Sequence, residues 1–316
     1  MNIKITGMGS YIPSQIEANE KFYQHDFLNA DGSVINNSTE VIVKKFKAIT
    51  GIEERRYIKN ELNNSDIAAL AAQKAIINAD INSEDLDYII VAHNYGDIAH
   101  GTVQSDTVPS IASRVKHLKI KNPRCVAYDI LFGCPGWVEG VIQAQAFIKA
   151  GMAKKCLVIG SETLSRVVDK HDRDSMIYSD GAGAAIVESS KDQGGILSHD
   201  TVTYAYDEAH FIYFGETNNQ DITDKRRYIK MYGRKIYEFA LTHVPVAMKS
   251  CLEKANIPIE NVKKILIHQA NEKMDEAIVK RFYKLHETSM PEDIMPMIID
   301  KLGNSSVATI PTLYDM

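Results

Sequence analysis

An α/β fold is predicted by the alternation of short apolar strands with amphipathic helices along the chain. The predicted strands are continuous apolar runs rather than alternating ones, which indicates that both of their faces are buried. Segments with apolar residues at helical spacing separate them. We therefore expect a largely parallel sheet that is covered by helices on both faces.

The predicted elements alternate in order along the first 190 residues. Five apolar segments are predicted to be strands, at residues 2–12, 86–94, 123–131, 154–162 and 181–188. Three segments with helical spacing lie between them, at residues 65–79, 110–118 and 137–151. Ser65 and Asp66 provide a cap for the first helix, and Gly151 closes the last.

A repeated pattern predicts two similar halves. Residues 79–91 read ADINSEDLDYIIV and residues 255–267 read ANIPIENVKKILI, at an offset of 176 residues. Both segments pass from a helix end through a short acidic turn into a strand that finishes in an apolar triplet. Units of this kind also recur by chance in α/β proteins, so duplication and coincidence are both open at this point.

The two halves are expected at residues 1–190 and 191–316. A second half as long as the first would extend several tens of residues past Met316. The last predicted helix, at residues 305–316, has no strand after it. We therefore expect the C-terminal half to lack its final strands.

Composition and charge argue against several classes of protein. The 316 residues are 45% hydrophobic and 24% charged, which is ordinary for a globular protein, and the net charge of −5 argues against a nucleic-acid binder. The four cysteines form no C-x-x-C pair and are too few for a disulfide scaffold, which indicates a reducing compartment. No apolar run approaches the roughly 18 residues that span a bilayer, and the N-terminus has no apolar signal region. We expect a cytoplasmic protein that is not embedded in a membrane.

The stretch VAYDILFGCPGWVEG, residues 126–140, places a thiol where a strand turns into a helix. Cys134 lies between the predicted strand and a helix that begins near Pro135. The helix dipole at this position lowers the pKa of a thiol and favours the nucleophilic thiolate, and the backbone N–H of Cys134 would help to hold an oxyanion. The alternative is a cysteine that only fills space beside a tight turn.

Two further segments carry groups that suit a nucleophile's partners. His268 lies in ILIHQAN, at the end of a predicted strand, where open α/β sheets present ligands. Asn304 follows Gly303 at the start of the last helix. Taken singly, a histidine there is more often structural and an asparagine there is usually a helix cap. Together with Cys134 they fit the logic of an activated nucleophile.

Six motifs, taken in order, closely resemble the β-ketoacyl-acyl carrier protein synthase III group of the thiolase superfamily. They extend from the N-terminus to the end of the chain and read GMGSYIP, TGIEERR, GCPGW, DGAGAAIVE, HQAN and GNSSVATIP. The resemblance implies a duplicated five-layer αβαβα fold, in agreement with the repeat. It also implies a catalytic triad of Cys134, His268 and Asn304.

The activity implied by the resemblance is a decarboxylating Claisen condensation in fatty acid biosynthesis. Cys134 would take an acyl group from a thioester of acyl carrier protein or coenzyme A. His268 and Asn304 would then stabilise the enolate formed from a malonyl-carrier thioester. The resemblance implies no metal and no redox cofactor, an acyl carrier protein as partner, and a homodimer.

The helix after HQAN is the expected docking surface for the acidic carrier. It carries Lys273, Lys280 and Lys284 on one face, with Arg281 beside them, and an apolar stripe of Met274, Ile278, Phe282 and Leu285 on another. Such a run of charges is usually only a solvated helix face. Its position beside His268 favours docking, which would act on encounter rate and orientation.

Some positions depart from the family pattern. Lys45 and Ile49 stand where initiating members of the family carry a Trp and an Arg that hold coenzyme A, so this donor is open to question. Val108 stands where an aromatic residue limits the acyl pocket, and a smaller side chain would admit a longer acyl group; Phe132 is a second candidate for that pocket.

Two other functions remain open from the sequence. The FGCPGW motif and the altered entrance resemble ketosynthases that form dialkylresorcinols by joining a β-ketoacyl unit to another acyl chain. A non-catalytic partner that binds acyl carriers or forms a heterodimer is the alternative of another class. The intact set of Cys134, His268 and Asn304 argues against it.

Overall fold

A computed structural model describes residues 2–316, apart from the side chain of Lys119. The strands are β1 (Asn2–Tyr11), β2 (Gln15–Ala18), β3 (Glu54–Tyr57), β4 (Tyr88–His93), β5 (Val126–Leu131), β6 (Lys155–Thr163), β7 (Asp180–Ser190), β8 (Ile212–Gly215) and β9 (Tyr228–Met231). The α-helices are α1 (Thr39–Thr50), α2 (Asn64–Asn78), α3 (Ile111–Lys119), α4 (Gly136–Lys149), α5 (Gly233–Lys254), α6 (Glu272–Lys284), α7 (Ile299–Leu302) and α8 (Thr309–Asp315). Short 3₁₀ turns include η2 (Ser83–Asp85), η5 (Ile259–Asn261) and η6 (Ser306–Ala308).

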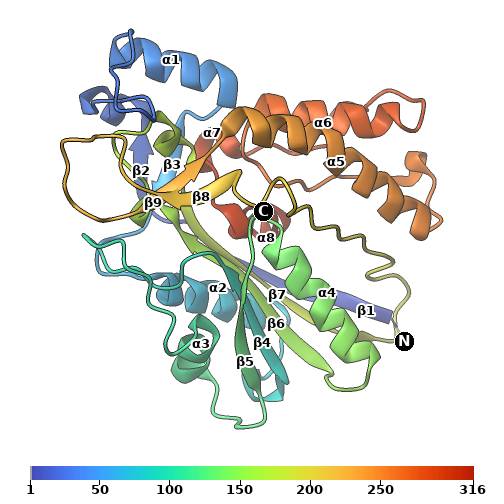
Figure 1. The fold of residues 1–316 in the computed structure, drawn as a ribbon. Helices are drawn as coiled ribbons and strands as arrows, with labels where there is room; N and C mark the ends of the chain where they lie inside the picture. Colours follow the sequence, from blue (N-terminus) through green and yellow to red (C-terminus); the bar gives the residue numbers. More distant parts are fainter. Residues whose placement is uncertain (1) are drawn as a thin grey trace.

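The N-terminal half is built on a five-stranded sheet in the order β1-β7-β6-β4-β5 (Figure 1). Strand β4 runs parallel to β5 and β6, whereas β7 runs antiparallel to both β6 and β1. The prediction of a largely parallel sheet therefore holds for β1, β4, β5 and β6, which all run in the same direction, and fails for β7 alone. Parallel neighbours need a crossover that is usually a helix, and β7 follows β6 through two short 3₁₀ turns instead.

Helices cover both faces of this sheet, as the continuous apolar strands predict (Figure 1). Ile89 and Val91 of β4 pack with α2 and α3 on one face. Ile90, between them, packs with α4 on the other face, where α8 also lies against the sheet. Successive side chains of a strand point to opposite faces, so a strand buried on both sides must be apolar throughout.

The repeat is visible in the structure as far as the 3₁₀ turn. Helix α2 is followed by Asp80 with φ of 52° and by η2, while α5 is followed by Asn256 with φ of 53° and by η5. These features keep the offset of 176 residues seen in the sequence. The division into halves at residue 190 stays a prediction.

The strand predicted to end at His268 does not form. Residues 263–270 have no regular secondary structure, and the side chain of Gln269 holds them in place. Its Nε2 donates to the carbonyl oxygen of Pro296 at 2.8 Å, and its Oε1 accepts from the N–H of Ile298 at 2.9 Å. A strand is defined by backbone bonds to a neighbouring strand, which the described residues do not supply at this place.

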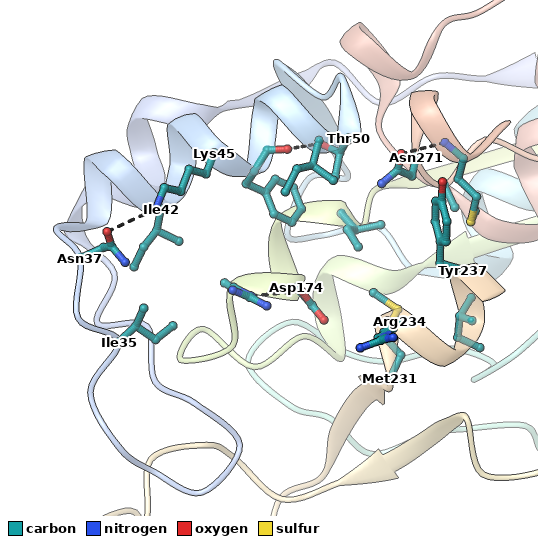
Figure 2. Close-up of a pocket in the computed structure, with 18 residues that line it drawn as sticks. Ile35, Asn37, Ile42, Lys45, Thr50, Asp174, Met231, Arg234, Tyr237 and Asn271 are labelled. Carbon is teal, nitrogen blue, oxygen red and sulfur yellow. Dashed lines mark hydrogen bonds and ion pairs between the residues drawn. The ribbon is translucent and has the colours of Figure 1, made fainter. Parts of the chain in front are cut away.

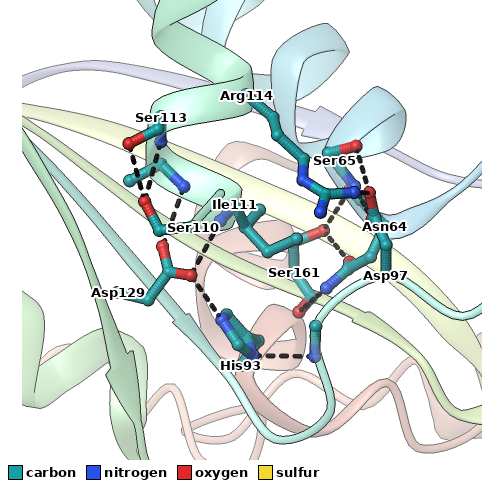
Figure 3. A network of polar contacts seen from close by, with 12 residues as sticks. Asn64, Ser65, His93, Asp97, Ser110, Ile111, Ser113, Arg114, Asp129 and Ser161 are labelled. Carbon is teal, nitrogen blue, oxygen red and sulfur yellow. Dashed lines mark hydrogen bonds and ion pairs between the residues drawn. The ribbon is translucent and has the colours of Figure 1, made fainter. Parts of the chain in front are cut away.

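A polar network holds the carboxyl ends of β4 and β5 (Figure 3). His93 Nδ1 accepts from the N–H of Gly96 at 3.0 Å, so its Nε2 donates to Asp129 Oδ2 at 2.9 Å. Asp129 also accepts the N–H groups of Ile111 and Ala112 at the start of α3. The segments that follow β4 and β5 therefore leave the sheet from fixed points.

In the part of the chain that the structure describes, no helix is long and apolar enough to cross a bilayer.

Candidate active site

Cys134 lies in the turn between β5 and α4, as the sequence predicts. Strand β5 ends at Leu131, and α4 begins at Gly136 after Pro135. The N–H of Gly136 donates to the carbonyl oxygen of Gly133 at 2.8 Å and closes the turn. The thiol thus lies at the positive end of a 14-residue helix.

The pKa of the Cys134 thiol lies below its ordinary value. Burial alone would raise this pKa. The charge of His268, hydrogen bonds from His268 and Ser306, and the backbone N–H of Cys134 outweigh burial and lower it. Ser306 Oγ lies 3.6 Å from Cys134 Sγ. These contacts favour a thiolate in the resting protein.

The imidazole of His268 shows the complementary shift. Burial would lower its pKa, but the Cys134 charge and hydrogen bond, the carboxylate of Asp275 and the backbone of Ser306 together raise it. Asp275 is 1% exposed in α6, and burial raises the pKa of its carboxyl to about 7 although the charge of His268 lowers it. The site therefore favours a thiolate and imidazolium pair.

Asn304 enters the site through its own turn. Its N–H donates to the carbonyl oxygen of Ile177 at 3.0 Å, and its carbonyl oxygen accepts from the N–H of Ser179 at 2.9 Å. Its side-chain Oδ1 accepts from the N–H of Ser306 at 2.8 Å. This bond occupies Oδ1 and leaves the Nδ2 group as the donor of the side chain.

Two glycines allow this turn to reach Cys134. Gly303 has φ of 62°, and a Cβ added there would lie 2.8 Å from the Cβ of Arg55. Gly160 in β6 lies under η6, where an added Cβ would collide with the carbonyl oxygen of Val307. Small residues are needed at both places for η6 to pack on the sheet beside Cys134.

Three further polar residues reach the site and were missed from the sequence. Asn94 follows β4, and its Nδ2 lies 3.3 Å from Ser306 Oγ. The backbone N–H and Nδ2 of Asn94 both donate to Glu162 Oε2 near the end of β6, at 2.9 and 2.5 Å. Burial raises the pKa of Glu162 to about 7. For Asn94 and Glu162, the signal that points to them is their position at the carboxyl ends of strands in an α/β sheet.

A cavity of about 540 Å³ lies between α1 and the starts of α5 and α6 (Figure 2). It reaches Asn271, three residues after His268, and Lys45 and Ile49 of α1 line it. Figure 2 shows Lys45 on one wall and Arg234 on another, with Asp174 between them. Burial, followed by the charge of Asp172, raises the pKa of Asp174 to about 6. Lys45 and Ile49, at which the chain departs from the family pattern, thus line a cavity that reaches Asn271, whereas Cys134, His268 and Asn304 are not among its lining residues.

The four cationic residues of α6 are exposed, and one of them also bonds to a neighbouring helix. Lys273 and Lys284 are exposed, and Lys280 pairs with Glu276 at 2.8 Å. Arg281 instead donates to the carbonyl oxygen of Leu241 at 2.9 Å and holds α6 to α5.

The apolar stripe of α6 is confirmed for Met274, Ile278 and Phe282, which are buried, whereas Leu285, just past the helix end, is 40% exposed. Of the two acyl-pocket candidates, Phe132 is half-buried two residues before Cys134. Val108 is 85% exposed in the loop before α3, so one chain alone does not enclose it. Its role in the pocket stays a prediction.

Comparisons with protein families, known sequences and solved structures all identify synthase III proteins as relatives. Residues 128–205 match the family model 3-Oxoacyl-[acyl-carrier-protein (ACP)] synthase III, and residues 252–316 match the corresponding C-terminal model. A β-ketoacyl-[acyl-carrier-protein] synthase III 1 of Vibrio vulnificus is 34% identical, over 100% of this chain and 90% of the relative. A synthase III of Clostridium botulinum is 34% identical, over 99% and 89%. The crystal structure of the 3-oxoacyl-[acyl-carrier-protein] synthase III of Aquifex aeolicus superposes with a TM-score of 0.79 at 31% identity, over 99% and 89%.

Proposed function

The chain belongs to the β-ketoacyl-[acyl-carrier-protein] synthase III family, and from that premise we propose that it is an acyltransferase of fatty acid biosynthesis that condenses an acyl group with a malonyl-carrier thioester. The pairing of Cys134 with His268 at the head of α4 carries this proposal. A thiolate at that position is a nucleophile suited to a thioester carbonyl.

In the first half-reaction, the Cys134 thiolate attacks the acyl thioester. The bond between Sγ and the acyl carbon forms as the bond from that carbon to the donor's sulfur breaks. The imidazolium of His268 returns a proton to the leaving thiolate, and the backbone N–H of Cys134 helps to hold the oxyanion.

In the second half-reaction, a malonyl-carrier thioester loses carbon dioxide. The electron pair of the broken carbon–carbon bond passes into an enolate, whose oxygen accepts hydrogen bonds from His268 and Asn304. The bond from Ser306 N–H to Asn304 Oδ1 supports this role, because it leaves Nδ2 as the donor. The nucleophilic carbon then attacks the acyl carbonyl, and Sγ leaves as the thiolate. Decarboxylation supplies the electron pair, so the proposal includes no metal or redox cofactor.

The carrier is proposed to dock on the exposed face of α6 beside the cavity. Lys273 follows the cavity residue Asn271 by two positions and is exposed. Positive charge there suits an acidic carrier protein and would act on the encounter rate. Arg281 contributes less to docking, because its guanidinium already holds α6 to Leu241.

A homodimer is proposed through the free edge of β5. In the described sheet β5 pairs with β4 alone, so its other edge has no strand beside it. Leu131 at the end of β5 is 70% exposed, and Val108 is 85% exposed. A second copy on this edge would pair the open backbone groups and cover both side chains.

The four cysteines are free thiols, which supports the reducing cytoplasm as the location.

Acyl transfer to Cys134 tests the function. The protein is incubated separately with acyl-coenzyme A and with acyl carrier thioesters of several chain lengths, and intact mass is measured. We expect an acyl adduct that is absent in Cys134→Ala. Failure of every donor to form an adduct would instead support a non-catalytic, carrier-binding protein. Transfer from long-chain carriers alone would support the specialised ketosynthase.

A further inference from the structure

Ser306 places a hydroxyl group against the nucleophile. Its Oγ lies 3.6 Å from Cys134 Sγ, and the residue is 4% exposed. Its backbone has φ of 51° and is held there by the bond from its N–H to Asn304 Oδ1. A non-glycine residue with positive φ is uncommon and needs such support. The hydroxyl is therefore fixed in place, and its usefulness to Cys134 depends on where its one proton points.

The side chain of Asn94 sets the direction in which the Ser306 hydroxyl proton points. Its backbone N–H and its Nδ2 both point at Glu162 Oε2, so the amide end that faces this carboxyl group is the NH₂. The second hydrogen of Nδ2 then faces Ser306 Oγ, at 3.3 Å. Ser306 thus accepts from Asn94, and its own proton is left for Cys134 Sγ. When Glu162 is ionised, reversing the amide would bring Asn94 Oδ1 against a carboxylate oxygen, and the Ser306 proton would be drawn away from the sulfur.

The members of this relay come from rigid elements. Glu162 is 1% exposed near the end of β6. Asn94 directly follows His93, which is fully buried and fixed by its bonds to Gly96 and Asp129. Fixed neighbours keep the amide of Asn94 in one orientation, which a mobile loop would not do.

We propose that Glu162 and Asn94 are positioning residues that orient the Ser306 hydroxyl so that it donates a hydrogen bond to the Cys134 thiolate. The inference rests on the proposed role of Cys134 as the nucleophile. Glu162 acts through Asn94, and Asn94 acts through Ser306. Only Ser306 touches the sulfur atom.

The test measures the thiol without any substrate. The rate of Cys134 alkylation by iodoacetamide is followed against pH, with the other cysteines accounted for by a Cys134→Ala blank. Ser306→Gly removes the hydroxyl and suits the positive φ, so the turn should fold as before. We expect its alkylation midpoint to rise by about one pH unit, since a hydrogen bond to a charged group stabilises it on that scale. Ser305→Ala is the matched control with no contact to Cys134, and its midpoint should not move.

A double-mutant cycle tests the order of the relay. Asn94→Ala removes the Nδ2 donor without adding charge, and we expect a rise in the midpoint that disappears when Ser306→Gly is also present. Glu162→Gln still offers a carbonyl oxygen to Asn94 and should keep most of the wild-type midpoint. Additive shifts for Asn94→Ala and Ser306→Gly, or no shift for Ser306→Gly, would overturn the relay.

The two proposals fail in different ways. If the wild-type thiol titrates like a free cysteine and no acyl adduct forms, the proposed function has failed. If the wild-type thiol is acidic and takes an acyl group but does not respond to Ser306→Gly, the relay alone has failed.

Discussion

Asp275 should cost the folded protein stability at neutral and alkaline pH. Its side chain is 1% exposed in α6, and burial raises its pKa from 3.8 to about 7, while the charge of His268 lowers it. A carboxyl group whose pKa is higher in the folded state binds its proton more tightly there than in the unfolded chain. Its favourable contribution is therefore complete below about pH 4 and is lost as the pH rises through about 7.

The substitution Asp275→Asn keeps the shape of the side chain and removes the charge. A shift of about three pKa units corresponds to about 4 kcal/mol, so we expect the variant to gain about 2 to 4 kcal/mol in the free energy of unfolding at pH 8. At pH 4 the protonated acid and the amide carry the same charge, and the two proteins should unfold alike. Urea denaturation followed by circular dichroism at pH 4, 6 and 8 measures the difference.

A matched control separates this effect from a general change in α6. Glu276→Gln removes the neighbouring exposed carboxylate and its pair with Lys280, and should change stability by no more than about 0.5 kcal/mol at any of these pH values. The reasoning is refuted if Asp275→Asn is no more stable than the wild type at pH 8. The more stable Asp275→Asn variant should hold the proton of His268 less tightly, because the charge of Asp275 raises the pKa of His268. In Asp275→Asn the imidazole should lose its proton at a lower pH than in the wild type.

Three other predictions concern catalysis, the fold and docking. His268→Ala should still form the acyl adduct on Cys134. Without its cationic partner the thiol ionises at a higher pH, so acylation of this variant should be faster at alkaline than at neutral pH. The variant should release no carbon dioxide from the malonyl carrier, and equal loss of both steps at every pH would contradict the assigned roles. Lys230→Met should lose about 3–5 kcal/mol in urea denaturation, because the buried carboxylate of Asp169, 2.7 Å from Lys230 Nζ, would have no cation; a loss below about 1 kcal/mol would speak against it. Lys273→Glu should raise the KM for the malonyl carrier roughly fivefold at low salt and much less at high salt, in steady-state assays; a change independent of salt would place docking elsewhere.

The sequence predicted well wherever short-range physics sets the structure. The Gly-Cys-Pro-Gly turn, the strand before it and the helix after it depend on neighbouring residues, and Cys134 lies where they place it. The helix end, the residue with positive φ and the 3₁₀ turn of the repeat also recur at the predicted offset. The apolar stripe of α6 was legible because its period matches the helix.

Predictions that needed a distant partner were less secure. Residues 263–270 have the composition of a strand, yet a strand exists only with a neighbour, and Gln269 holds this segment instead. The direction of β7 depended on the path of its connection rather than on its apolar residues. Arg281 also bonds to Leu241 on another helix, which the sequence could not show, and its part in docking stays a prediction.

By itself the sequence predicted which groups would carry the chemistry, namely a thiol at a helix start with a histidine and an asparagine far along the chain, because residue types and local turns depend on neighbouring positions. Only the tertiary structure decided how the thiol is held. Ser306 meets Cys134 across 172 residues, and Glu162 meets Asn94 across 68. Hydrogen bonds depend on distance and direction in space, and those arise when the sheet brings its strand ends together.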